Sequence, residues 1–205
     1  MTKERPILFS APMVRAILEG RKTVTRRPVK TDWIQSDRAP LNTAPGLFHF
    51  WCSGEHVCPY GEPGQRLWVR ETFMDLLGTG VEHRPDPNGP LQRYAYRADY
   101  PPGSHSDEAR KDFGLKWKPS IHMPRAACRI LLEITDVRVE RLQDISRAEI
   151  RAEGLQCPPE LASDDVSPNY RDWYPAAWKE LWNSTGGDWD GNPWVWVVEF
   201  KRVQP

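Results

Sequence analysis

Prolines are unusually frequent in this chain: 20 of its 205 residues are proline, and they are accompanied by ten tryptophans. Proline fixes the backbone angle φ and removes a hydrogen-bond donor, so it interrupts helices and is kept out of central strands. Tryptophan buries a large ring surface and anchors the segment that carries it. We therefore expect short regular elements joined by extended, turn-rich segments that large aromatic side chains hold in place.

Four segments alternate apolar and polar residues or are rich in β-branched residues, as strands are. The longest, Cys128–Val139, has the strongest pattern and is expected in the middle of a sheet or barrel. The last, Pro193–Phe200, is apolar enough to be central as well. The other two predicted strands are Arg66–Phe73 and Arg93–Ala98.

Three helices are predicted from their caps and their apolar spacing. Ser10 is a suitable N-cap for a short amphipathic helix that ends before Gly20. Ser146 and Glu149 have the spacing of a capping box, so a second helix is expected to run to about Glu153 and to stop before the following glycine. A third helix is expected over about 170–183, where an apolar stripe is formed by Tyr174, Ala177, Trp178, Leu181 and Trp182.

These elements suit one domain, 1–205, of the α+β class, with insertions at about 32–62 and 74–120. The first insertion is expected to be irregular, and the second is expected to be loops on either side of the strand at Arg93–Ala98. Few helices, several strands and long loops favour a small mixed β-barrel flanked by short helices. No apolar run approaches the roughly 18 residues of a membrane span, and the first residues lack the apolar segment of a secretory signal. We therefore expect a cytoplasmic protein with no membrane partner.

Basic residues are concentrated in one short segment, although the chain as a whole is neutral. Lysine plus arginine and aspartate plus glutamate each total 28, which argues against a generally basic surface for nucleic acid. Within seven residues, however, the segment Arg21–Arg27 holds four cations and two hydroxyls just after the first predicted helix. That helix is therefore expected to dock by one face and to present this segment at its C-terminal end.

The sequence contains four cysteines, Cys52, Cys58, Cys128 and Cys157, and disulfides are not expected in a cytoplasmic chain of this size. Cys52, His56 and Cys58 are close enough in sequence to share a zinc ion, with Cys157 or His49 as a fourth ligand. Their spacing is not that of a standard zinc ribbon, so free thiols are the alternative and no metal is assigned. No cofactor is expected.

Four short motifs, in this order along the chain, resemble those of the ASCH domain. They are Gly20-Arg21-Lys22-Thr23-x-Thr25-x-Arg27, Pro63-Gly64-x-x-Leu67-x-Val69, Ala152-Glu153-Gly154 and Trp196-Val197-Val198-Glu199-Phe200. They span nearly the whole chain, although the two insertions exceed the minimal domain. Long members of the family encoded by phages and prophages are similar in the segments Cys58-Pro59-Tyr60-Gly61 and Ile121-His122-Met123-Pro124-Arg125.

The resemblance implies a β-barrel similar to the PUA fold of RNA-modifying proteins, with a cleft for a nucleobase, a nucleoside or an RNA segment. Some small bacterial members are N4-acetylcytidine amidohydrolases that use a lysine, a threonine and a glutamate. Motif by motif, these residues fall on Lys22, Thr25 and Glu153. Other members resemble ribonucleases or plain RNA-binding proteins, so a non-catalytic module for RNA or DNA and a ribonuclease are the alternatives.

Hydrolysis of an amide needs a nucleophile, a base that takes its proton and a donor for the leaving amine. In this assignment Thr25 attacks, Lys22 is the base, and Glu153 protonates the leaving nitrogen or holds the substrate. The pKa of Lys22 must then fall from about 10.4 towards neutrality, which burial and neighbouring cations favour. The cations available are Arg21, Arg26 and Arg27, which are also suited to bind a phosphate or an oxyanion.

Each of the three catalytic candidates also has a purely structural explanation. Lys22 is equally explained as a solvated lysine after a helix C-terminus, where cations are favourable. Thr25 is explained as a strand residue, and Glu153 as a surface residue paired with Arg147 or Arg151. Their occurrence together, in the order of the family motifs, favours one functional pocket.

Three further residues are candidates for binding substrate or nucleic acid. Glu71 follows a predicted strand and either faces the same cleft or is an ordinary acid at a strand end. His122 and Arg125 precede the longest strand and are candidates for a phosphate, with a core position as the alternative for His122. Among the tryptophans, Trp51 and Trp117 in polar loops are the candidates for base stacking, whereas those in strands are expected in the core.

Overall fold

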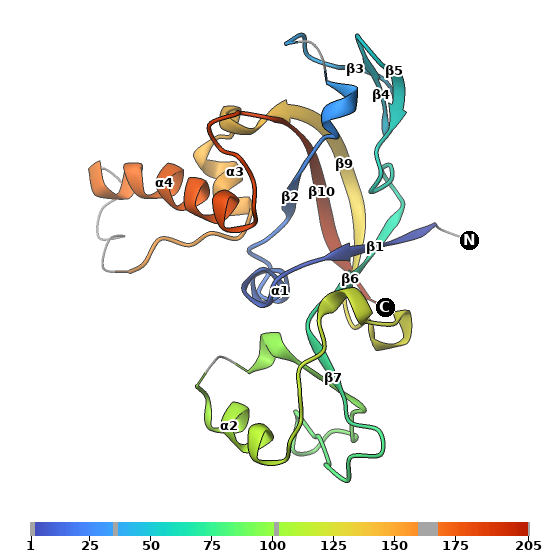
Figure 1. Ribbon diagram of the computed structural model, residues 1–205, viewed down its shortest axis with the longest axis vertical. Helices are drawn as coiled ribbons and strands as arrows, with labels where there is room; N and C mark the ends of the chain where they lie inside the picture. Colours follow the sequence, from blue (N-terminus) through green and yellow to red (C-terminus); the bar gives the residue numbers. More distant parts are fainter. Residues whose placement is uncertain (1–2, 35–36, 101–102, 160–167, 205) are drawn as a thin grey trace.

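The computed structural model describes residues 3–34, 37–100, 103–159 and 168–204. It is a mixed α+β fold that consists mostly of sheet, with few helices (Figure 1). The main sheet has the strand order β1-β6-β9-β10-β2, and its pairs are antiparallel except for the parallel pair β1 and β6. These strands span Glu4–Leu8 (β1), Val24–Pro28 (β2), Arg66–Arg70 (β6), Leu131–Arg141 (β9) and Trp194–Val203 (β10).

Strands β9 and β10 form the centre of this sheet and confirm the two strongest strand predictions. They pair along nearly their whole length. Successive side chains of a strand point to opposite faces, so a strand in the middle of a protein must be apolar on both sides. In β10, one buried cluster receives Trp194, Trp196 and Val198, and another receives Val195 and Val197.

The main sheet is open: among the described residues, β1 and β2 are edge strands, and no strand pairing closes the sheet into a barrel. The prediction of a strand-rich α+β fold is therefore confirmed, whereas the predicted small barrel is not closed by hydrogen bonds. The length and composition of the two edge strands explain why the sheet stays open. Each edge strand has only five residues and contains a proline, Pro6 in β1 and Pro28 in β2, which lacks the N–H that pairing with a second neighbour would use.

Helices α1 (Ala11–Leu18), α3 (Arg147–Ala152) and α4 (Pro168–Ser184) confirm the three predicted helices. The capping box of α3 is present: the Ser146 side chain accepts from the backbone of Glu149, and the Glu149 side chain accepts from the backbone of Ser146. In Figure 1, α3 and α4 lie together on one side of the sheet. Trp178 and Trp182 of α4 are buried there, in the cluster that includes Val195 and Val197 of β10.

The first insertion contains a small sheet, which corrects the prediction of an irregular loop at about 32–62. Strands β3 (Leu41–Ala44), β4 (Leu47–Phe50) and β5 (Gly54–Val57) pair antiparallel in that order. Phe48 and Phe50 alternate with outward-facing residues of β4, and both pack edge-on against Trp196 (5.2 and 6.0 Å between ring centroids). These rings fix the small sheet to the face of the main sheet that lies opposite α4.

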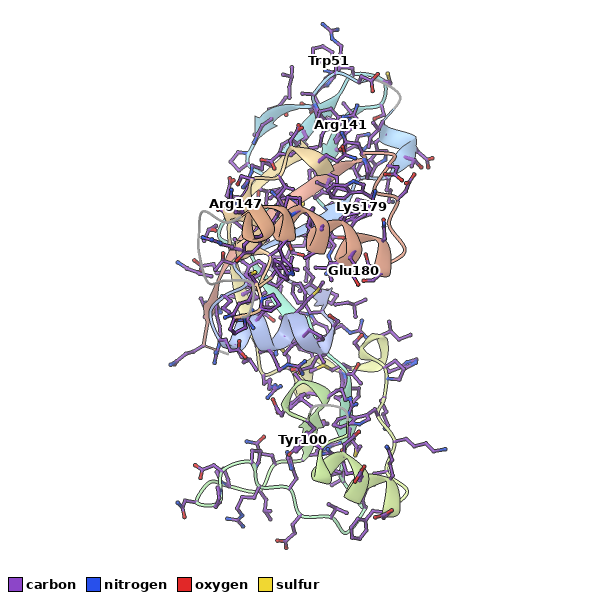
Figure 2. All side chains as sticks on the ribbon, turned by 90° about the vertical axis from the view of Figure 1, so that its left-hand side faces the viewer. Trp51, Tyr100, Arg141, Arg147, Lys179 and Glu180 are labelled. Carbon is purple, nitrogen blue, oxygen red and sulfur yellow. The ribbon has the colours of Figure 1, made fainter. Side chains whose placement is uncertain are left out.

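The second insertion, at about 74–120, contains the strand predicted at Arg93–Ala98, which is confirmed, and a helix where a loop is predicted. Strand β7 (Phe73–Asp75) pairs antiparallel with β8 (Tyr94–Tyr96), and helix α2 spans His105–Asp112. The region projects from one end of the elongated molecule, where Figure 2 labels Tyr100, and Trp51 of the first insertion marks the other end. Both insertions are thus structured extensions of the central sheet.

Short 3-10 turns occur in the connections at Thr31–Trp33, Arg97–Asp99, Ser120–His122, Arg125–Ala127 and Leu142–Asp144. None of the helices within the described ranges is long and apolar enough to cross a membrane.

Candidate active site

The turn after α1 brings Lys22 against the end of α3. Gly20 takes a positive φ of 76°, and the next two backbone N–H groups both donate to the carbonyl of Ala16 (2.8 and 3.0 Å). This tight turn directs the chain across the end of α3, where Lys22 forms an antiparallel bridge with Glu153. Two residues that are 131 positions apart in the sequence thereby become neighbours.

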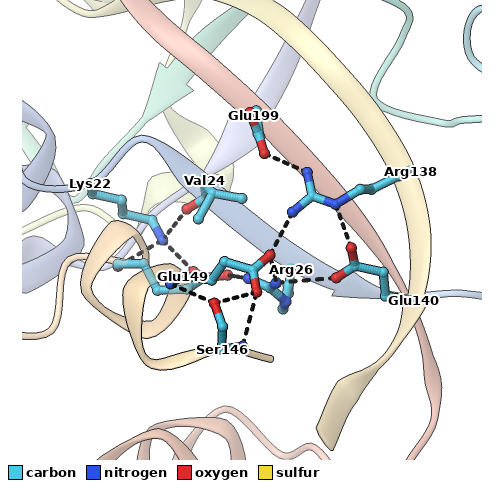
Figure 3. A network of polar contacts seen from close by, with 9 residues as sticks. Lys22, Val24, Arg26, Arg138, Glu140, Ser146, Glu149 and Glu199 are labelled. Atoms are coloured by element: carbon cyan, nitrogen blue, oxygen red, sulfur yellow. Dashed lines mark hydrogen bonds and ion pairs between the residues drawn. The ribbon is translucent and has the colours of Figure 1, made fainter. Parts of the chain in front are cut away.

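The side chain of Lys22 is completely buried, and its ammonium group is fully hydrogen-bonded (Figure 3). Nζ donates to the carboxylate of Glu153 (2.6 Å), to the carbonyl of Glu153 (3.0 Å) and to the carbonyl of Val24 (2.8 Å). Burial lowers the pKa of Lys22; Glu153 opposes this by stabilising the charged form, and the charges of Arg27 and Arg26 lower the pKa further. The alternative of a solvated lysine is therefore wrong.

Glu153 is the C-cap residue of α3 and is only 3% exposed. Its second carboxylate oxygen accepts a hydrogen bond from Arg26 (3.3 Å), whose guanidinium is buried and also bonds to Glu149 (2.9 Å) and Glu140 (3.3 Å). Lys22 and Arg26 together offset the unfavourable position of a carboxylate at a helix C-terminus. The alternative of a surface glutamate is wrong, and Arg26 serves to hold Glu153 rather than to meet solvent.

A second layer of ion pairs surrounds Arg26. Arg138 of β9 bonds to Glu149 (2.6 Å), to Glu140 and to Glu199 of β10 (Figure 3). Burial alone would raise the pKa of Glu149, but hydrogen bonds from its helix cap and the two arginines lower it to about 2. Sequence analysis misses Arg138 and Glu140; their spacing of two in β9, which places them on one face, is the signal that could identify them.

A cleft between α1 and α4 reaches the Lys22–Glu153 pair. It encloses about 340 Å³, within the range of small-molecule sites, and is lined by α1, residues 153–155 and α4. Most of the lining is apolar and includes Met13, Leu155 and Leu181, while Glu153 is its one charged residue within the described chain. Met13, Leu181 and Glu153 also line a second, narrow pocket of about 30 Å³ next to β2.

Thr25 lines this narrow pocket, together with Arg26, Arg27 and two tryptophans of α4. It lies in β2, opposite Val198 of β10, and is 3% exposed. Both explanations from the sequence therefore apply to Thr25, which is a strand residue and a pocket residue at once. Thr25 and Glu153 line one pocket. Lys22 is not among the lining residues and donates a hydrogen bond to the carboxylate of Glu153.

Gly154 allows α1, Lys22 and the end of α3 to meet. Its φ is +96°, and a Cβ added to it would lie 2.8 Å from Cβ of Ala16 and 3.1 Å from Cβ of Lys22. A side chain at this position would have to push the turn away from α3. The glycine of the Ala-Glu-Gly motif therefore sets how closely Lys22 approaches Glu153.

The two remaining arginines of the basic segment bond to backbone carbonyls. Arg21 bonds to Glu19 (2.7 Å) and to the carbonyl of Gly154 (2.5 Å). Arg27 donates to the carbonyl of Leu8 (2.6 Å) and is half-buried at the narrow pocket. Of the three arginines of the basic segment, Arg26 and Arg27 line this pocket, and Arg27 is the one of these two with part of its side chain exposed.

The other three binding candidates lie outside the cleft. Glu71 is buried and pairs with Arg129 (2.9 and 3.0 Å); burial raises the pKa of Glu71, and Arg129 opposes the rise. His122 and Arg125 are both exposed, and Arg125 pairs with Glu4 (2.9 Å). The core position considered for His122 is therefore wrong, and the structure does not bring these residues to Lys22.

The tryptophans divide between core and surface as follows. Trp194 and Trp196 of β10 are buried, as the strand pattern predicts, whereas Trp68 of β6, which is also expected in the core, is only partly buried. Trp51 is 41% exposed at the end of the molecule. Trp117 packs inside the second insertion, where its indole N–H donates to Asp107 (3.2 Å). Neither stacking candidate has a free ring: the guanidinium carbon of Arg38 lies 4.5 Å from the ring centre of Trp51, and those of Arg110 and Arg97 lie 4.7 and 5.5 Å from that of Trp117.

The cysteine and histidine candidates do not gather into a metal site. Cys52 is exposed at the turn between β4 and β5, whereas Cys58 is completely buried in the core, so the hairpin separates them. His56 stacks on Trp33 (4.0 Å between ring centroids), and its Nε2 lies 2.8 Å from the hydroxyl of Ser53. In the part of the chain that the structure describes, no three His, Cys, Asp or Glu side chains are grouped to hold a metal ion.

No family model, no curated protein and no solved structure matched this chain when it was compared with them. Its chemistry must therefore be inferred from the site itself: a buried lysine and glutamate in contact, a threonine that lines a small pocket with the same glutamate, and an apolar cleft beside them.

Proposed function

We propose that the chain is an ASCH-domain protein with a PUA-like fold, whose cleft binds a nucleobase or modified nucleoside and hydrolyses its exocyclic N-acyl group. N4-acetylcytidine is the model substrate. One observation carries the proposal: Glu153 and Thr25 line the same cavity, and Nζ of Lys22 lies 2.6 Å from the carboxylate of Glu153. These are the residue types that acyl transfer from an amide requires.

The contacts between the ASCH-like motifs support the family assignment. The first motif meets the third through the bridge between Lys22 and Glu153, and it meets the last because β2 pairs with β10. The second motif contributes β6, which pairs with β9 next to β10. Motifs that are far apart in the sequence thus meet in one sheet and in the bridge beside it, and the first and third of them line the cleft or the narrow pocket.

The contact between Lys22 and Glu153 supplies both a base and an acid. Transfer of one proton along the 2.6 Å hydrogen bond converts the ammonium and carboxylate into a neutral amine and a carboxylic acid. Burial favours this neutral pair over two buried charges, whereas Arg26, bonded to Glu153, favours the carboxylate. A substrate that displaces water from the cleft adds to the burial and shifts the balance towards the neutral pair.

In the proposed reaction, the hydroxyl oxygen of Thr25 attacks the acyl carbon and gives its proton to the neutral amine of Lys22. The C–N bond then breaks, and the carboxylic acid of Glu153 protonates the leaving exocyclic nitrogen. The free nucleoside departs and leaves an acyl ester on Thr25. Water hydrolyses that ester, one of its protons returns to the threonine oxygen, and the carboxylic acid product is released.

The charges around the cleft favour a small substrate over an extended nucleic acid. The net charge is zero, Arg26 is buried among carboxylates, and Arg21 and Arg125 are paired with Glu19 and Glu4. Non-specific binding of a nucleic-acid phosphate backbone needs several unpaired lysine or arginine side chains along one surface. The largely apolar cleft, of about 340 Å³, instead suits one base and its acyl group.

A turnover assay tests the proposal. Purified protein is incubated with N4-acetylcytidine and other N-acylated nucleosides, and the products are identified by mass spectrometry. The wild type is expected to release the free nucleoside and the acid, and Thr25→Val to lower the rate by about a thousandfold or more. Thr23→Val is the matched control, since Thr23 is an exposed threonine two residues away in the same segment.

The alternatives give other results in the same assay. If no acylated nucleoside is turned over while an added RNA is shortened, the chain is a ribonuclease. If nothing is cleaved and RNA binds with an affinity that falls by roughly 0.7 log units per log unit of salt for each contact, the chain is a binding module. Equal turnover by wild type, Thr25→Val and Lys22→Ala would refute the assignment of the catalytic residues.

A further inference from the structure

A second hollow of about 340 Å³ lies at the start of β10 and shares no lining residue with the cleft between α1 and α4. Apolar side chains of Val29, Ile34 and Pro193 form one part of its wall, and Arg141 with Trp194 forms another. Trp194 belongs to the buried cluster on the face of β10 opposite α4, so the two cavities lie on different faces of the sheet.

Arg141 is held in place by its neighbours. It is the last residue of β9 and the cross-strand partner of Trp194, the first residue of β10. Its guanidinium carbon lies 4.4 Å from the centre of the Trp194 ring, and Nη1 donates to the carbonyl of Asn192 (3.0 Å). Figure 2 labels Arg141 between α4 and the end of the molecule that carries Trp51. A planar guanidinium fixed on an indole ring in this way is prepared to bind an anion.

The second terminal nitrogen of Arg141 bonds to Asp37 (2.6 Å), and this carboxylate also lines the hollow. The Asp37 side chain is 102% exposed, whereas that of Arg141 is 23% exposed. An ion pair with a fully exposed carboxylate is weak, because water competes for both charges and the side chain loses freedom on pairing. Asp37 therefore occupies a position that the anionic group of a ligand can take.

We propose that this hollow binds a small organic anion: a phosphate or carboxylate group on Arg141, in place of Asp37, joined to an apolar or aromatic body that fills the space beside Val29, Ile34 and Pro193. Both halves of such a ligand are needed. The anionic group gains a charge-assisted, planar partner, and the body removes apolar surface from water. The site is independent of the amide hydrolysis proposed for the other cleft.

Calorimetric titration with phenyl phosphate tests the site, with phenol and inorganic phosphate as probes of each half and benzoate as the carboxylate counterpart. Phenyl phosphate or benzoate is expected to bind more tightly than phenol or inorganic phosphate alone. Arg141→Gln should weaken binding of the anion by about tenfold or more. Asp37→Asn should tighten it about two- to fivefold, because it removes the competing carboxylate. The matched control is Arg84→Gln, which changes an exposed arginine in another loop and should leave the affinity unchanged.

Two results would overturn the proposal: phenyl phosphate and benzoate both fail to bind at millimolar concentration, or Asp37→Asn and Arg141→Gln both keep the wild-type affinity. Because Asp37 is exposed, its variant folds even if Arg141→Gln does not, so the comparison stays decisive. Thr25→Val should bind phenyl phosphate like the wild type. Loss of binding in that variant would place the probe in the other cleft and would also overturn the proposal.

Discussion

The ammonium group of Lys22 lies 2.6 Å from a carboxylate oxygen of Glu153, and the two side chains are 0% and 3% exposed. Removing two charges from water is unfavourable unless their remaining hydrogen-bonding groups are satisfied. Here they are: Lys22 also donates to two carbonyls, and Glu153 also accepts from Arg26. The pair therefore fixes the turn after α1 against the end of α3 and places Glu153 in the cleft.

Breaking this pair from either side should destabilise the fold strongly. Lys22→Met leaves a buried carboxylate with one cation fewer, and Glu153→Gln leaves a buried ammonium without its counter-charge. Each is expected to lower the free energy of unfolding by about 3–5 kcal/mol, measured by urea denaturation. The control is Lys179→Met: its pair with Asp190 is 47% and 85% exposed, and the expected loss is about 0–1 kcal/mol.

The double variant Lys22→Met with Glu153→Gln decides whether the two residues act as a pair. The double variant should be destabilised by less than the sum of the two single effects, by about 1 kcal/mol or more. Each single variant leaves one buried charge without its partner, whereas the double variant removes both charges. Strict additivity of the two single effects would contradict the coupling inferred from the 2.6 Å contact.

Gly154→Ala should be more damaging than Gly20→Ala, although both glycines have positive φ (96° and 76°). An alanine at either position incurs the strain of the left-handed region, about 1–2 kcal/mol. At Gly20 the new methyl group meets nothing within 4 Å, whereas at Gly154 it comes to 2.8 Å from Cβ of Ala16. The additional loss at Gly154 is expected to be about 1–3 kcal/mol in thermal or urea unfolding.

Adding Ala16→Gly to Gly154→Ala provides the check on that explanation. It removes the atom that the new methyl group would contact, so part of the lost stability should return despite the lower helix propensity of glycine in α1. If the combined variant is less stable than Gly154→Ala by the full cost of a helical glycine, steric contact is not the cause.

Sequence patterns predict the parts of this fold that depend on local chemistry. The capping box of Ser146 and Glu149, the turn at Gly20 and the apolar strands β9 and β10 each need only neighbouring residues to be recognised. Strand β1 and the small sheet β3–β5 are not predicted, because their strands have four or five residues and their stability comes from partners far away, such as Trp196 beneath Phe48.

The candidate site also has residues that local motifs identify and residues that depend on distant partners. Lys22, Thr25 and Glu153 can be selected from motifs, and the structure brings Glu153 and Thr25 to one cavity. The sequence does not reveal that Arg26 is buried among three carboxylates or that Arg138 links β9 to α3, because these ion pairs join residues more than ten positions apart. Nor does it show that the strand-end acid Glu71 pairs with Arg129 instead of facing the cleft.

Stability should fall as the pH is lowered from about 4.5 towards 2, in part through Glu149. Its pKa is about 2 in the folded protein and 4.5 ordinarily, because the hydrogen bonds of the Ser146 cap and the charges of Arg26 and Arg138 outweigh burial. A depressed carboxylate pKa contributes stability above the ordinary pKa, and this contribution is lost as the pH falls through the folded value. Glu149→Gln should therefore be less stable at neutral pH and show a flatter decline in urea midpoint between pH 4.5 and 2.

The comparison for Glu149 is Glu180→Gln, which changes an exposed glutamate on α4 (Figure 2). It should keep the wild-type slope of stability against pH over the same interval. An unchanged slope in Glu149→Gln itself would mean that its carboxylate is not held by the arginines in the way the structure shows.

The pH dependence of turnover should report the charge on Lys22 and should respond to Arg27. Because the reactive pair shares one proton, the rate should fall once the pH exceeds the pKa of Lys22, which burial places below its ordinary value: Glu153 then has no proton to give to the leaving nitrogen. The charge of Arg27 contributes to that lowering, so Arg27→Gln should raise the pKa and move the alkaline limb of the rate profile to higher pH. Arg21→Gln is the matched control, since Arg21 bonds to exposed Glu19 and should leave the limb in place. A limb that moves equally in both variants, or in neither, would show that the titrating group is not Lys22.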